Sequence, residues 1–124
     1  MSLLRKLLGR TGEDRAADHL ARRGFRILER NYSAPYGEID LIALDGDTVV
    51  FVEVKTRTTD AYGAPELAVD RRKQGRMVKA ALGYLKRRSL HQVPCRFDVV
   101  AISGRDGGTV QHIPNAFEMD RSGY

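Results

Sequence analysis

Four charged residues stand inside two apolar segments of the chain, and their types and spacing suggest chemistry. The stretch "GEIDLIALDGDTVVFVEVKTR", residues 37–57, reads as two strands joined by a tight Asp-Gly-Asp turn. Glu38 and Asp40 lie in the first strand, and Glu53 and Lys55 lie in the second. Because burying a charge without a partner is expensive, this placement needs a physical reason.

Alternation along the two strands predicts that these charges share one face of a sheet. Residues two apart in a strand point the same way, so Glu38 joins Asp40, and Glu53 joins Lys55. A short turn brings Asp40 opposite or diagonal to Glu53 on that face. In the helix predicted nearest the N-terminus, Glu13 shares the inward face. It either joins this cluster or complements the helix dipole, and both readings stay open.

Carboxylates outnumber ammonium groups in this predicted cluster, since Lys55 is the only cation counted beside four acidic residues. Two like charges about 4 Å apart cost about 4 kcal/mol at an effective dielectric constant near 20. A divalent cation would remove that cost, and oxygen ligands without His or Cys favour Mg²⁺ or Mn²⁺. The alternative is a solvated Lys-Glu ladder on an exposed face. Val49 and Phe51 make the same face partly apolar, which favours the metal.

The elements that position these residues are expected to form a single α/β domain over residues 1–124. The predicted order is α-β-β-β-α-β, with a mixed sheet flanked by helices, because strands that are apolar on both sides need cover on both sides. Residues 1–11 are interpreted as an N-terminal extension and 115–124 as a C-terminal tail. The first predicted helix covers residues 12–23, with Thr11 as its N-cap and Gly24 as its stop. A second helix is predicted from Pro65-Glu66 to about Arg88. The predicted strands cover 25–32, 38–44, 48–56 and 96–102, with an optional short strand over 109–113.

Positive charge is concentrated in one segment. The net charge is +5, and residues 71–90, "RRKQGRMVKAALGYLKRRSL", hold eight basic residues and no acidic one. Such a run favours a polyanion, with nucleic acid first among the partners. A merely solvated helix face is the alternative for this run.

The remaining composition bears on location. No apolar run reaches the roughly 20 residues that cross a bilayer, so no membrane partner is expected. A single cysteine, Cys95, allows no internal disulfide and is typical of the reducing cytoplasm. His19, His91 and His112 lack metal-ligand spacing, which argues against zinc.

The ordered motifs resemble a known group of proteins. "GEIDLIA", "VFVEVKTR", the Gly, Pro and Glu before the second helix, and "RFDVV" are similar to the YraN-like family of small bacterial proteins. An inward Glu, an Asp and then Glu-Val-Lys also resemble the active site of restriction-endonuclease-like nucleases, the PD-(D/E)XK group. The resemblance covers residues 12–102 and implies a fold similar to archaeal Holliday-junction resolvases. Ile39 stands where that group commonly has proline, which lowers motif specificity without removing any chemistry.

The resemblance implies a role for each matching residue. Asp40 and Glu53 would be the main metal ligands, with the Val54 carbonyl as a third and Glu13 acting directly or through a water. Lys55 would orient or activate the attacking water, and Gln74 would be a polar helper. The implied nucleic-acid contacts are Arg57, for which a solvated strand end is the alternative, together with Arg71, Arg72, Lys73, Arg76 and Lys79.

These expectations define the functional hypotheses. The first is a Mg²⁺- or Mn²⁺-dependent endonuclease that hydrolyses DNA phosphodiester bonds, with branched or damaged DNA as candidate substrates and RNA left open. The second is a non-catalytic nucleic-acid-binding protein that retains the nuclease fold, and the third is an interaction or assembly protein. The resemblance to junction-cutting nucleases also suggests a homodimer.

Overall fold

Two helices and five strands make up the computed structural model, which describes residues 3–57, 69–103 and 108–119. The chain order is α-β-β-β-α-β-β, so the predicted order is confirmed and the optional last strand is present. The elements are α1 (Leu3–Arg22), β1 (Arg26–Ala34), β2 (Gly37–Asp45), β3 (Thr48–Thr56), α2 (Arg71–Arg87), β4 (Cys95–Ser103) and β5 (Thr109–Phe117).

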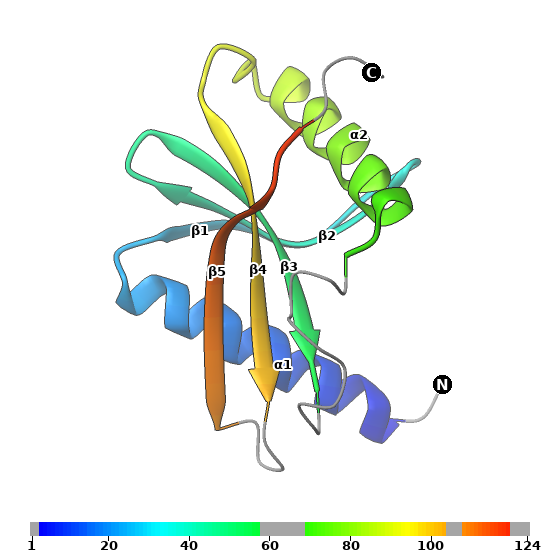
Figure 1. Ribbon diagram of the computed structural model, residues 1–124, viewed down its shortest axis with the longest axis vertical. Helices are drawn as coiled ribbons and strands as arrows, with labels where there is room; N and C mark the ends of the chain where they lie inside the picture. The colour runs from blue at the N-terminus through cyan, green and yellow to red at the C-terminus, as the bar shows by residue number, and fades with distance from the viewer. Residues whose placement is uncertain (1–2, 58–68, 104–107, 120–124) are drawn as a thin grey trace.

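The strands form one mixed sheet in the order β1-β2-β3-β4-β5. Neighbouring strands pair antiparallel except β3 and β4, which run parallel because α2 carries the chain back between them. α1 and α2 lie on opposite sides of the sheet (Figure 1). The mixed sheet with helices on both faces therefore matches the predicted class.

Each face of the sheet has its own apolar core. On the α1 side, a cluster that includes Ala16, Leu20 and Val52 is buried. On the α2 side, a larger cluster that includes Phe51 and Tyr84 is buried. Alternate residues of β3 supply the two clusters, as the period of a strand requires, so its continuous apolar run is explained by cover on both faces.

The first helix is longer than the sequence predicted. It begins at Leu3 rather than at Gly12, so the prediction of Thr11 as its N-cap is wrong and residues 3–11 of the predicted extension are helical. Leucine, lysine and arginine in this segment are good helix formers, which outweighs the local capping pattern. Gly12 has a packing role instead, because a Cβ atom there would lie 2.6 Å from the Thr56 hydroxyl. The helix ends at Arg22, and Gly24, which has φ +92°, follows as the expected stop.

The second helix begins later than predicted. Pro65 and Glu66 lie outside the described residues, but α2 starts at Arg71, after the extended residue Asp70. The Asp70 carboxylate accepts the backbone N–H of Lys73 at 2.8 Å, which is an N-cap interaction. The start at Pro65 is therefore wrong for this helix, because Asp70 supplies the capping geometry.

Two shorter predictions concern turns and the C-terminal segment. β2 and β3 are joined by a two-residue turn between Asp45 and Thr48, with Gly46 at φ +59°, so the predicted hairpin is confirmed. β5 extends to Phe117, beyond the predicted end at residue 113, and takes in part of the predicted tail. Neither helix, within the described part of the chain, is long and apolar enough to cross a membrane.

A buried carboxylate ties β4 to β5 on the α1 side. Asp98 is fully buried and accepts hydrogen bonds from the Arg96 guanidinium at 3.0 Å and the Asn115 N–H at 2.9 Å, and lies 2.7 Å from His112 Nε2. Burial alone would raise the pKa of Asp98, but the His112, Arg96 and Asn115 interactions hold it below its usual value. This carboxylate is fully partnered inside the fold, so the "RFDVV" motif has a structural role here.

Replacing Asp98 with alanine is expected to destabilise the protein strongly. Asp98→Ala leaves Arg96 and His112 without their buried partner, and breaking such a pair costs about 3 to 5 kcal/mol. Urea denaturation followed by circular dichroism measures the change. Asp18→Ala is the control, because its pair with Arg22 is exposed and should contribute less than about 1 kcal/mol. Equal losses in the two variants would contradict the assignment.

Candidate functional site

β2 and β3 separate where the charged residues begin. Their ladder runs from Asp45–Thr48 to Leu41–Val52 and stops there, while β2 continues beside β1 and β3 continues beside β4. The Asp40 carboxylate accepts the backbone N–H of Val54 at 2.8 Å. Ile39 packs in the α2-side core although Leu41 packs in the α1-side core, so β2 twists at this point. The fork therefore opens beside Asp40.

A hollow of about 420 Å³ lies at this fork, against the first turns of α2. Asp40 and Glu53 both line it, so the two carboxylates share one site as alternation predicted. A larger hollow of about 750 Å³ lies at the opposite end of α2 and is lined mainly by apolar residues. Among the residues that the structure describes, those lining the smaller hollow are Gly37, Glu38, Asp40, Glu53, Lys73, Arg76 and Met77.

Asp40 carries a strongly perturbed carboxyl group. Burial and the negative charge of Glu53 raise the pKa of Asp40 to about 7, and the charge of Glu13 adds to the increase. The Val54 N–H and the Lys73 ammonium group oppose the shift but do not cancel it. Near neutral pH this carboxyl is therefore divided between its protonated and ionised forms.

Glu53 is almost fully buried, with a side chain 6% exposed, and it is paired with two lysines. Lys73 Nζ donates to Glu53 Oε1 at 2.5 Å, and Lys55 Nζ lies 3.9 Å from the same oxygen. Burial and the adjacent Lys73 ammonium group lower the pKa of Lys55. Burial alone would lower the pKa of Lys73, but its hydrogen bond to Glu53 raises it overall.

The charge balance differs from the one expected from the sequence. Lys55 was the only cation counted, and that count is wrong because Lys73 reaches in from α2 as a second one. Glu38 lines the hollow but is exposed, so its charge is solvated. The excess negative charge is therefore smaller than predicted and is concentrated on Asp40.

The predicted set of three carboxylate ligands is not assembled. Among the described residues, no group of three or more His, Cys, Asp or Glu side chains is arranged to hold a metal ion. Glu13 is half-buried on α1 and affects Asp40 through its charge. Asp40 and Glu53 remain as an oxygen-only pair that repel each other, and one or two carboxylates with water suit Mg²⁺. The residues present therefore fit a hard divalent cation held by two side chains.

Three of the predicted site residues have contacts that the sequence did not indicate. Gln74 Nε2 donates to the Val69 carbonyl at 2.8 Å and so binds the start of its own helix. Gln74 does not line the hollow, and the prediction that its amide takes part in the site lacks support from these contacts. Val54, predicted to offer its carbonyl, donates its N–H to Asp40. Lys73, predicted to face nucleic acid, is half-buried on Glu53.

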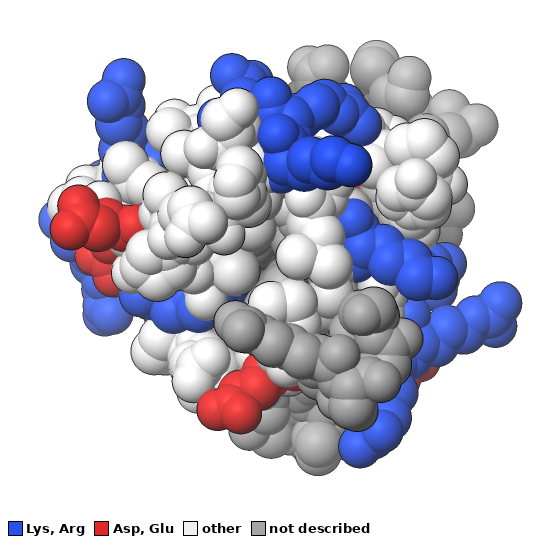
Figure 2. Space-filling view, turned by 90° about the horizontal axis from the view of Figure 1, so that it is seen from above, with Lys and Arg blue, Asp and Glu red and all other residues white. Residues whose placement is uncertain are grey.

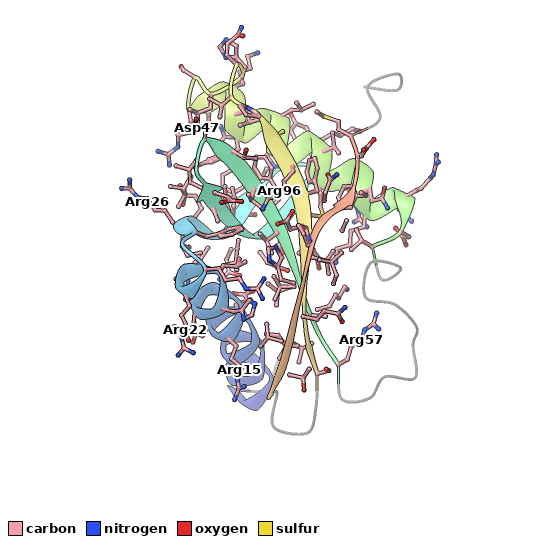
Figure 3. All side chains as sticks on the ribbon, turned by 60° about the vertical axis from the view of Figure 1, so that its left-hand side comes forward. Arg15, Arg22, Arg26, Asp47, Arg57 and Arg96 are labelled. Carbon is pink, nitrogen blue, oxygen red and sulfur yellow. The ribbon has the colours of Figure 1, made fainter. Side chains whose placement is uncertain are left out.

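Of the other predicted cationic contacts, Arg76 is the one that lines the hollow. Its backbone packs so closely on the β1–β2 turn that a Cβ atom at Gly37 would lie 3.2 Å from Arg76 Cβ. Arg57 follows β3 on the α2 side of the sheet (Figure 3). Lys and Arg cover more of the face seen in Figure 2 than acidic side chains do. The predicted contacts Arg71, Arg72, Arg76 and Lys79 are exposed on α2, as are Lys86 and Arg87 near its C-terminal end.

A sequence signal for the position of Lys73 was present. Met77 is an apolar residue that packs in the core, and Lys73 lies four residues before it, so both belong to one stripe of the helix. Asp70 three residues before Lys73 also matches a capping pattern that places this lysine in the first turn. Assigning Lys73 to nucleic-acid contact, together with the other basic residues of this segment, left both signals unused.

Comparison with known proteins assigns this chain to a family. The model of the uncharacterised protein family UPF0102 matches residues 12–102. The chain belongs to this family. The resemblance to YraN-like proteins is thereby confirmed. The family match does not test the resemblance to restriction-endonuclease-like nucleases.

UPF0102 relatives match nearly the whole chain. A UPF0102 protein of Geobacter sulfurreducens is 50% identical over 92% of this chain and 91% of its own length. UPF0102 proteins of Trichlorobacter lovleyi and Syntrophus aciditrophicus are 48% and 51% identical, over 90% of this chain each and over 91% and 88% of their own lengths. These names state no activity, so function is inferred from the site.

Replacing Asp40 with asparagine is expected to stabilise the metal-free protein above neutral pH. The folded pKa of Asp40, about 7, lies above its unfolded value of 3.8, so wild-type stability falls as pH rises from about 4 to 7. Asp40→Asn lacks this loss. One pKa unit is worth about 1.4 kcal/mol, and solvent screening leaves an expected advantage of about 2 kcal/mol at pH 8.

Urea denaturation with a chelator at several pH values tests this expectation. The difference in unfolding free energy between Asp40→Asn and wild type should be small at pH 4 and grow toward pH 8. Asp47→Asn, in the exposed hairpin turn, is the matched control and should follow the wild-type profile. Parallel profiles for wild type and Asp40→Asn would refute the assignment of a raised pKa.

Proposed function

We propose that this protein is a divalent-metal-dependent nuclease that hydrolyses phosphodiester bonds in DNA. The observation that carries the proposal is the meeting of Asp40 and Glu53 at the fork between β2 and β3, with Lys55 beside them. Such a carboxylate pair with an adjacent ammonium group matches the needs of phosphoryl chemistry better than those of fold stability. The motif resemblance to restriction-endonuclease-like nucleases and junction resolvases supports the same reading.

The perturbed charge of the site supports a metal in particular. Asp40 keeps a pKa of about 7 although a hydrogen bond and a lysine both favour its ionised form. Groups whose pKa is shifted by burial and a specific charge partner are concentrated at functional sites. Asp40 and Glu53 would hold Mg²⁺ or Mn²⁺, which supplies positive charge to a phosphate oxygen and activates water.

The protein's own residues divide the remaining work. Lys55 lies 3.9 Å from Glu53, where its ammonium group can stabilise negative charge on the phosphate and orient the attacking water. Its lowered pKa makes loss of a proton easier, which suits a group that activates this water. Glu13 adds negative charge behind Asp40 and can contact the site through water. Arg76, on the rim of the hollow, and the exposed cations of α2 would hold the sugar-phosphate backbone without reading sequence.

Carboxylate substitutions are expected to abolish metal-dependent cleavage. Asp40→Asn and Glu53→Gln each remove a charged ligand oxygen, and because loss of an outer-shell partner already costs 10- to 100-fold, losses of at least about 100-fold are expected. Gel assays with branched, single-stranded and duplex DNA, and with RNA, measure the rate with Mg²⁺ or Mn²⁺. Asp47→Asn should cut like wild type. The proposal fails if both site variants keep the wild-type rate.

Basic residues of α2 are expected to govern affinity through the phosphate backbone. Arg72→Ala and Arg76→Ala should each weaken binding of all sequences alike and reduce the slope of log K against log salt by about 1. Fluorescence anisotropy at several salt concentrations measures both effects. Arg26→Ala, an exposed arginine at the start of β1, is the matched control and should leave the slope unchanged. A slope that no α2 substitution alters would exclude this surface.

A non-catalytic nucleic-acid-binding protein is the second candidate, favoured by one observation. Lys73 neutralises Glu53 within the chain itself, so a protein of this fold can keep its buried carboxylate without a metal. Calorimetric titration with Mn²⁺ separates the candidates. The nuclease requires metal uptake that Asp40→Asn and Glu53→Gln abolish, whereas a pure binder shows nucleic-acid affinity without such uptake.

A further inference from the structure

Lys73 stands out as the cationic side chain that the proposed chemistry does not use. It comes from the first turn of α2, twenty residues along the chain from Glu53. Its ammonium group contacts the same carboxylate oxygen, Glu53 Oε1, that Lys55 approaches less closely. The two lysines therefore compete for one oxygen, and Lys73 has the shorter contact.

A metal ion and the Lys73 ammonium group compete for this carboxylate. Glu53 is almost fully buried, and both Lys73 and Lys55 contact its Oε1 atom. A divalent ion on Glu53 would place its double positive charge within a few ångströms of the ammonium group, and like charges at that range repel strongly in a partly buried site. Metal binding therefore weakens the contact of Lys73, the lysine closer to Glu53, more than that of Lys55.

The local structure allows Lys73 to leave without moving α2. Its backbone N–H stays bonded to the Asp70 cap at 2.8 Å, and the first turn is further held by the bond from Gln74 to Val69. The Lys73 side chain is 33% exposed, so its flexible stem can rotate outward into the hollow. Arg76 lies on the same rim, so a released ammonium group would join it where a phosphate would approach.

We infer that Lys73 is an exchangeable counterion of Glu53, which pairs with this carboxylate in the metal-free protein and moves to the nucleic-acid phosphate when metal binds. The inference rests on the proposed function, since it names how the same site changes between two states. It makes Lys73 a positioning residue that holds the buried carboxylate in place before the metal arrives. It also couples metal uptake to phosphate binding, because the exchange frees a cation at the rim.

Metal affinity without nucleic acid tests the exchange. Mn²⁺ is titrated calorimetrically into wild type, Lys73→Gln, Lys73→Arg and Lys86→Gln at pH 8, after melting curves confirm folding. Lys73→Gln should bind Mn²⁺ on the order of tenfold more tightly, because the competing charge is gone. Lys73→Arg, which keeps the charge, and Lys86→Gln, which removes a charge from the far end of α2, should not gain affinity.

A labelling measurement on the wild-type protein does not depend on any variant folding. Acetic anhydride modifies free amines, and mass spectrometry reports the extent at each lysine. Saturating Mg²⁺ should increase acetylation of Lys73 several-fold, because the ammonium group leaves Glu53, while acetylation of Lys86 stays constant. Unchanged labelling of Lys73 at saturating metal would overturn the exchange.

The outcomes also separate this inference from the proposed function. Equal Mn²⁺ affinity of wild type and Lys73→Gln, with uptake in both, overturns the exchange and leaves the metal-dependent nuclease standing. Absence of uptake in wild type and in every variant overturns both. Tighter binding by Lys73→Gln alone, together with metal-induced labelling of Lys73, supports the exchange.

Discussion

Beyond Leu41 and Val52, strands β2 and β3 no longer pair, and the candidate site depends on this separation. If β2 and β3 stayed paired here, backbone hydrogen bonds between the two strands would occupy the space beside Asp40. At the fork, the Asp40 carboxylate takes the Val54 N–H instead, so a buried backbone donor is satisfied by a side chain. The hollow between the strands and α2 forms because this side-chain hydrogen bond takes the place of backbone pairing between β2 and β3.

Positive charge around the hollow offsets most of the negative charge, but the cations are unevenly distributed between the two carboxylates. Glu53 has two lysines beside it, whereas Asp40 has the Val54 N–H and a more distant lysine. Burial then raises the pKa of Asp40, and the metal-free site can lower its energy by taking up a proton there. A divalent ion would serve both carboxylates at once, which is the physical basis for preferring a metal-binding role.

The two sides of the sheet treat buried carboxylates in opposite ways. Asp98, on the α1 side, accepts hydrogen bonds from Arg96 and Asn115 and also contacts His112, and its pKa lies below the usual value. Asp40, on the α2 side, has a raised pKa and faces a hollow. A carboxylate whose oxygens all have hydrogen-bond or ion-pair partners fits a structural role. A carboxylate with few such partners and a hollow beside it is a candidate for a functional role. Asp98 is fully buried, whereas Asp40 is only half-buried.

Sequence periodicity determined the strands, the hairpin turn and the placement of Asp40 and Glu53 on one face, because alternation within a strand follows from local backbone geometry. The tertiary structure alone decided where β2 leaves β3 and that the partner of the Lys73 ammonium group is Glu53. These features depend on how a helix packs against a sheet across twenty or more residues of chain, and no local period encodes that distance.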